Sequence, residues 1–120
     1  MAKVFLAGYI VELLQERERV LRDAGYQVTM ALSFATAAAA VGQELFDVAV
    51  LGFSIPENER NQLAHAIKQA NPATKIIMIY FDSIKNTELA DALLQTTAGA
   101  EGLLRAIKHI LAAQDHVRTG

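Results

Sequence analysis

Residues 48–51 are the feature that most limits what this chain can fold into. All four are apolar (Val-Ala-Val-Leu) and two are β-branched, which predicts a strand buried on both faces. Such a strand belongs in the middle of a parallel sheet covered by helices on each side. Gly52 follows it, and Pro56 stiffens the next loop by fixing its own φ. Because ligands of open α/β sheets bind beyond the carboxyl ends of the strands, a site is expected near Gly52.

The other apolar runs alternate between strand and helix patterns. Gly25 predicts the end of the first helix, and Ser33 is a suitable N-cap for the second. Residues 82–90 are too few for an ordinary helix with two connections, so a vestigial fourth helix or a loop is expected there. The alternation predicts an α/β fold with a doubly wound, five-stranded parallel sheet in the flavodoxin-like order 2-1-3-4-5. The predicted strands are 3–7, 26–32, 48–51, 75–79 and 91–95, and the predicted helices lie at 12–24, 33–45, 63–70 and 103–111.

The first predicted helix carries a dense set of charges. Its apolar residues recur at helical spacing, which assigns the charges to the other faces. Glu18 and Arg22 are four residues apart and are expected to form an ion pair. The pattern favours a solvated helix face over a binding patch. The charged residues are Glu12, Glu16, Arg17, Glu18, Arg19 and Arg22.

Composition narrows the class of protein. With 120 residues, 52% of them hydrophobic, the chain can form one domain with a core on both faces of a sheet. Its net charge of −2 argues against nucleic-acid binding, and no apolar run approaches membrane-spanning length. The absence of cysteine excludes disulfides and is typical of a reducing compartment. One cytoplasmic domain is expected at 1–113, followed by a tail at 114–120.

No pattern for metal binding or nucleophilic catalysis is present in the sequence. His65, His109 and His116 have no second histidine, cysteine or carboxylate at ligand spacing. Gly8 is not followed by the glycines of a dinucleotide fingerprint, and no Ser-His-Asp or Cys-His arrangement is visible. We therefore expect no metal, no cofactor and no enzymatic activity.

Two phrases of the chain resemble bacterial response-regulator receiver domains. One is Phe46–Glu57, the central strand with its Ile-Pro-Glu loop ending, and the other is Leu21–Val28, at the first helix–strand junction. The resemblance covers nearly the whole chain, although it is moderate at 95–107 and poor at 82–90. It implies the receiver form of the flavodoxin-like fold and a role in two-component, phosphorelay signal transduction.

The resemblance also implies which positions would carry phosphoryl transfer. A receiver accepts a phosphoryl group on an aspartate with the help of magnesium, a cation that prefers carboxylate and other oxygen ligands. Here the acceptor position is Gly52, and the acidic pair is replaced by Gly8 and Tyr9. The sensing hydroxyl aligns with Tyr80 and the phosphate-pairing lysine with Thr96. Because all these groups are lost together, the resemblance implies a degenerate pseudo-receiver that cannot be phosphorylated.

A few residues near these positions could substitute for the lost groups. The simpler interpretation gives Ser54 a turn hydrogen bond, Asp82 a capping role and the glutamates a solvated position. The possible rim residues are Phe53, Ser54, Phe81 and Asp82, and the possible extra carboxylates are Glu12 and Glu57.

Three functions are compatible with the sequence. The first is a signalling module that binds a protein, such as a signalling protein, a histidine kinase or a second copy of this chain. The second is a small-molecule sensor, with a ligand in the crevice left by the missing acids. The third is a phosphorelay receiver with an atypical acceptor. The sequence favours the first.

The loss of the lysine and of its following proline carries structural expectations. Thr97 stands where receivers have the proline, so we expect a trans Thr96–Thr97 bond, because the cis form costs about 3–4 kcal/mol without a proline. The degraded fourth helix is expected to bare the edge of the fifth strand and one flank of 103–111 as a docking surface.

The tyrosines near the lost acids are expected to fill the space that those acids vacate. Tyr80 or Tyr9 should cover Gly8 and Gly52, because an aromatic ring fills such a hole well. Strand alternation should point Tyr80 and Phe81 in different directions.

Overall fold

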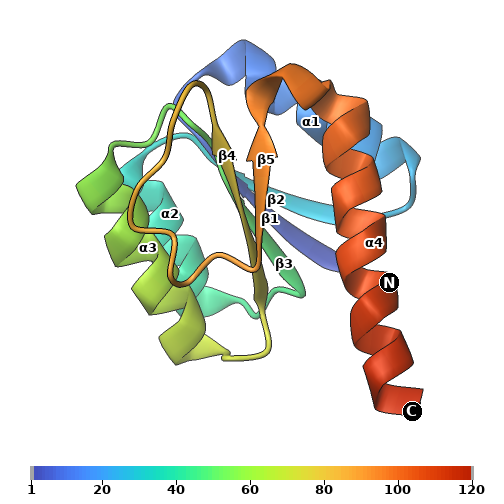
Figure 1. Cartoon of the computed structure of the whole chain (residues 1–120). Helices are drawn as coiled ribbons and strands as arrows, with labels where there is room; N and C mark the ends of the chain where they lie inside the picture. Colours follow the sequence, from blue (N-terminus) through green and yellow to red (C-terminus); the bar gives the residue numbers. More distant parts are fainter. Residues whose placement is uncertain (1, 120) are drawn as a thin grey trace.

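The computed structural model describes residues 2–119, and the side chains of residues 2–113. Five parallel strands form one sheet in the order β2-β1-β3-β4-β5 (Figure 1). The predicted doubly wound flavodoxin-like fold is therefore confirmed. The strands are β1 (Lys3–Ala7), β2 (Gln27–Ala31), β3 (Val48–Leu51), β4 (Lys75–Tyr80) and β5 (Ala92–Gln95).

Helices cover both faces of this sheet. In Figure 1, α2 and α3 lie on one side and α1 and α4 on the other. Strand alternation divides the core accordingly: Phe5 and Leu51 pack toward α2 and α3, whereas Leu6 and Val50 pack toward α1 and α4. The helices are α1 (Val11–Asp23), α2 (Phe34–Gln43), α3 (Glu57–Ala70) and α4 (Gly99–Thr119).

Local sequence signals place the ends of α1 and α2 as predicted. Gly25 has a φ of 98°, in the left-handed region that glycine adopts readily. Its N–H donates to the Arg22 carbonyl, and the N–H of Tyr26 donates to the Leu21 carbonyl, which is the Schellman pattern. At α2, the Ser33 hydroxyl accepts from the backbone N–H of Thr36.

The segment between β4 and β5 contains no helix, in agreement with the expectation for 82–90. Residues 81–91 instead form a loop that is tied to α3. The guanidinium of Arg60 donates from Nη2 to the Lys85 carbonyl at 2.6 Å, and the Asn86 amide donates to Glu57 at 2.8 Å. Ile84 and the other partly buried apolar residues of this loop pack on the α2/α3 side of the core.

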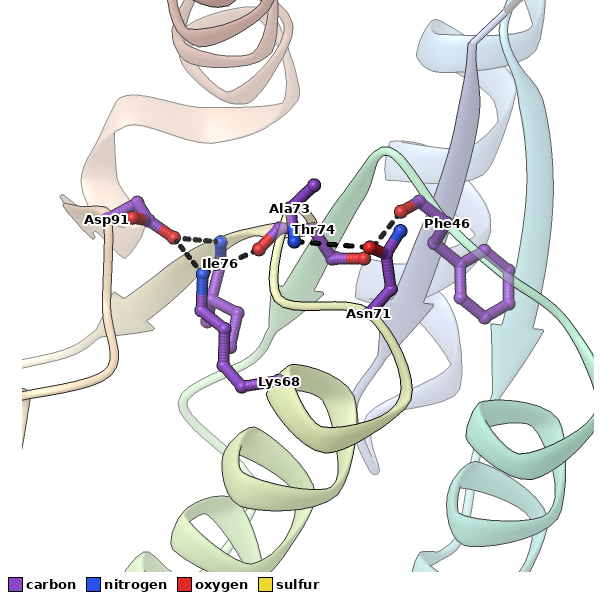
Figure 2. Close-up of polar contacts among 7 residues, drawn as sticks. All are labelled: Phe46, Lys68, Asn71, Ala73, Thr74, Ile76 and Asp91. Atoms are coloured by element: carbon purple, nitrogen blue, oxygen red, sulfur yellow. Dashed lines mark hydrogen bonds and ion pairs between the residues drawn. The ribbon is translucent and has the colours of Figure 1, made fainter.

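A cluster of polar contacts fixes the end of this loop at the amino ends of the strands (Figure 2). The Asp91 carboxylate accepts from the Ile76 N–H at 2.8 Å and from the Lys68 ammonium at 3.0 Å. Lys68 also donates to the Thr74 carbonyl, and the buried Thr74 hydroxyl donates to the Phe46 carbonyl at 2.6 Å. These bonds join α3, β4 and the starts of β3 and β5. The cluster therefore has a structural role.

The last helix extends further than the sequence pattern indicated. Its backbone continues through Thr119, across most of the segment expected as a tail at 114–120, while Gly120 lies outside the described residues. None of the helices in residues 2–119 has the length and apolar character needed to cross a bilayer.

Candidate functional site

Three of the five positions assigned to phosphoryl transfer lie together at the carboxyl edge of the sheet. Gly8 follows β1, Gly52 follows β3, and Thr96 follows β5. The two glycines lie side by side, because a Cβ on Gly52 would be 3.6 Å from Gly8 Cα. The topology therefore brings together the positions that the sequence singled out, although none of these three residues carries a carboxylate.

The side chain that occupies this edge is Arg17, which reaches it from the middle of α1. Its Nη1 atom lies 3.5 Å from where a Cβ on Gly52 would stand, and its Nη2 atom donates to the Thr96 hydroxyl at 3.5 Å. Arg17 is only 6% exposed. Burial lowers the pKa of its guanidinium, an effect that the neighbouring Glu16 carboxylate partly opposes. A cation thus stands beside the position that the resemblance assigns to the acidic acceptor.

Two sequence-based expectations fail at this point. Arg17 was assigned to a solvated face, and a tyrosine was expected over Gly8 and Gly52. Arg17 is three residues after Leu14 and four before Leu21, both buried, so its position on the sheet-facing stripe was readable from the sequence. Because Arg17 is charged, it was nevertheless assigned to the solvated face. The other expectation for α1 is confirmed, since Glu18 and Arg22 form an ion pair at 3.1 Å.

Tyr9 is turned toward α3 and does not cover the glycines. Its hydroxyl donates to Glu59 at 2.6 Å, and its backbone N–H donates to the Ser54 hydroxyl at 2.7 Å. Burial raises the pKa of Tyr9 to about 12, and the hydrogen bond to Glu59 and its negative charge act in the same direction. Ser54 consequently holds the β1 and β3 loops together, which is a longer-range bond than the expected turn contact.

Tyr80 and three of the four possible rim residues, Phe53, Phe81 and Asp82, line a separate cleft beside this edge. The cleft has a volume of about 220 Å³ and includes the buried Arg60 in its wall. Both Tyr80 and Phe81 line it, at the point where β4 ends. That their side chains point in different directions stays a prediction. Phe81 is 66% exposed and packs on Phe53, with ring centroids 5.8 Å apart. The other lining residues are Ile79 and Ser83.

The carboxylates considered as substitutes do not gather at Gly52. Glu12 and Asp82 are exposed, and Glu57 is engaged by Asn86. Among the residues that the structure describes, no three histidine, cysteine or acidic side chains come together as a metal site. His65 and His109 are exposed, whereas the side chain of His116 lies outside the described residues.

Solved structures identify the architecture, although no protein-family profile and no curated protein matches the sequence. A CheY-like response regulator receiver domain from Methanospirillum hungatei is similar with a TM-score of 0.85 at 23% identity, covering 97% of this chain and 98% of that one. A receiver domain protein from Clostridium thermocellum has a TM-score of 0.82 at 18% identity, over 98% and 99% of the two chains. The response regulator TrrA from Thermotoga maritima, solved with Mg²⁺-BeF, has a TM-score of 0.77 at 17% identity, over 91% and 98%.

This chain has the receiver-domain fold. After β5, Thr96–Ala98 form a 3₁₀ turn that leads into α4. No peptide bond in the described residues is cis, so the expected trans Thr96–Thr97 bond is confirmed. The turn brings the Thr96 hydroxyl within hydrogen-bond reach of Arg17.

Proposed function

We propose that this chain is a pseudo-receiver, a receiver-like domain that is not phosphorylated and that acts in signal transduction by binding another protein. The observation that carries the proposal is the position of Arg17. Its guanidinium lies against Gly52, so the place of the acceptor side chain is taken by a positive group.

Phosphoryl transfer at this edge would have neither an acceptor nor a way to hold magnesium. The receiver reaction needs a carboxylate nucleophile and oxygen ligands for the cation. Gly8, Tyr9 and Gly52 supply no carboxylate, and a nearby guanidinium would repel a divalent cation. The proposal therefore assigns the domain no enzymatic activity. It also assigns the domain one conformation, whereas a phosphorylated receiver would switch between two.

Beryllofluoride with magnesium provides the test of this function. The amide NMR spectrum of this chain is expected to remain unchanged in their presence, because Gly52 offers no carboxylate to the fluoride complex. TrrA, which was solved with Mg²⁺-BeF, serves as the positive control under the same conditions. Specific shifts at Gly8, Gly52 and Thr96 that require both reagents would contradict the proposal.

The docking surface that we propose lies on β5 and the adjoining flank of α4. The loop at 81–91 replaces a helix there, and Leu93 on the edge strand is 47% exposed. Self-association, or binding of a histidine kinase or another signalling protein, is expected to use this surface. Leu93→Glu should weaken any complex measured by sedimentation, whereas Leu32→Glu, at 41% exposure after the opposite edge strand, should not. Equal effects of the two changes would argue against this surface.

The proposal places the domain in the cytoplasm and gives it no nucleic-acid or membrane partner. A net charge of −2 and the absence of cysteine support this part of the proposal.

A further inference from the structure

Two cationic side chains are buried in the described part of the chain, and their surroundings differ. Arg60, 7% exposed, donates to the Lys85 carbonyl and lies 4.0 Å from the Glu57 carboxylate. Arg17 is equally buried, yet none of the ion pairs among the described residues includes it. Its neighbour Glu16 is exposed to solvent. Arg17 is therefore a buried cation that has no carboxylate in contact with it.

The hydrogen-bonding capacity of Arg17 is largely unused. A guanidinium has five N–H donors and keeps its proton in proteins. The structure gives Arg17 one hydrogen bond to the described residues, at the long distance of 3.5 Å to Thr96. Burying a charge without a partner is costly, and an oxyanion is the partner that a guanidinium fits best.

The free donors of Arg17 remain within reach of solvent. Among the described residues, Arg60 Nε is the one side-chain nitrogen or oxygen that is both fully buried and without a hydrogen-bond partner. The unbonded nitrogens of Arg17 do not share that condition, so they keep some contact with solvent. No acidic side chain at positions 8, 9 or 52 would repel an anion there.

Two hydroxyl groups lie at the same edge of the sheet as Arg17. Thr96 contacts Arg17 directly. The Ser54 oxygen lies 3.6 Å from where a Cβ on Gly8 would stand, next to Gly52, and it accepts from the Tyr9 N–H. A hydroxyl that accepts one bond still has its own proton to donate. The edge thus presents a guanidinium and two hydroxyl groups beside Gly8 and Gly52, with Leu14 Cδ1 at 2.7 Å from where a Cβ on Gly8 would stand.

We propose that Arg17, with the hydroxyls of Thr96 and Ser54, binds a small oxyanion, a phosphate or a carboxylate, reversibly and without a metal ion. This inference goes beyond protein binding and does not require it. The bound anion would supply the counter-charge that the chain itself does not place beside Arg17.

The test is an NMR titration of ¹⁵N-labelled protein with sodium phosphate and, separately, sodium acetate, in the presence of a chelator. Sodium chloride at matched ionic strength reports screening alone. Saturable shifts are expected at the Arg17 side chain and at Gly8, Gly52, Ser54 and Thr96 in at least one of the two oxyanion arms. The arm that binds more tightly identifies the phosphate or the carboxylate source.

Arg17→Met is expected to weaken the binding at least about tenfold, the equivalent of losing one charge-assisted hydrogen bond. Arg19→Met, on the exposed side of α1, should leave it unchanged. Thr96→Val should weaken it by a smaller factor and provides a second variant if Arg17→Met does not fold. The absence of saturable shifts in both oxyanion arms, or equal binding by Arg17→Met, would overturn the inference. Because no phosphoryl donor is used, either result leaves the proposed lack of phosphorylation untouched.

Discussion

In an Arg17→Met background, the change Gly52→Asp is expected to cost about 3 kcal/mol more in unfolding free energy than the same change beside the native arginine. The reason is the 3.5 Å between Arg17 Nη1 and the position of a Cβ at residue 52. An aspartate there would pair with the guanidinium, whereas without Arg17 the carboxylate would be buried and uncompensated. Urea denaturation of the four proteins in this double-mutant cycle measures the coupling.

The single change Arg17→Met provides the control for this cycle. With Gly52 in place, it should alter stability by less than about 1 kcal/mol, because it removes a desolvated charge that has no counter-ion. The coupling should also shrink as the pH falls, because the introduced carboxylate is protonated first in the Arg17→Met background, where burial raises its pKa, and only at lower pH beside Arg17. If Arg17→Met costs the same whether residue 52 is glycine or aspartate, the guanidinium does not stand at the acceptor position.

The change Thr74→Val is expected to lower the free energy of unfolding by about 1–3 kcal/mol. Thr74 is 2% exposed, and its hydroxyl donates to the Phe46 carbonyl at 2.6 Å in the cluster of Figure 2. Valine keeps the shape but leaves that carbonyl buried without a partner. Denaturation by urea, with the slope against denaturant compared between the proteins, measures the loss.

Thr97→Val supplies the matched comparison for this prediction. Thr97 is exposed in the turn before α4, so the same chemical change should stay within about 0.5 kcal/mol of the native stability. A loss at Thr74 no larger than the loss at Thr97 would show that the hydroxyl of Thr74 does not satisfy a buried carbonyl.

The sheet and its order were predictable because their signals are local and apolar. The run at 48–51 and the Schellman end at Gly25 each follow from a few adjacent residues, and both appear in the structure. Residues 82–90 are likewise too few for an ordinary helix with two connections, which indicated that a full helix would be missing there. The bonds that hold the replacing loop, from Arg60 to the Lys85 carbonyl, span distant residues and could not be read from spacing.

The sequence predicted where the candidate site lies but not which side chain occupies it. The resemblance to receiver domains implied that Gly8 and Gly52 would meet, and they do. The occupant was missed because a charged residue within an amphipathic helix is ordinarily solvated, whereas the length of the Arg17 side chain lets its guanidinium pass from the sheet-facing stripe to the strand ends. Tyr9, which was expected over the glycines, donates its hydroxyl to Glu59 instead.

The most direct test of a receiver fold without a receiver's chemistry is the intact mass of the protein after incubation with acetyl phosphate and magnesium. A receiver that retains its acceptor aspartate serves as the positive control. With Gly52 at the acceptor position and Arg17 beside it, the mass of this chain is expected to remain that of the unmodified protein. A stoichiometric gain of one phosphoryl group, stable or transient, would contradict the account.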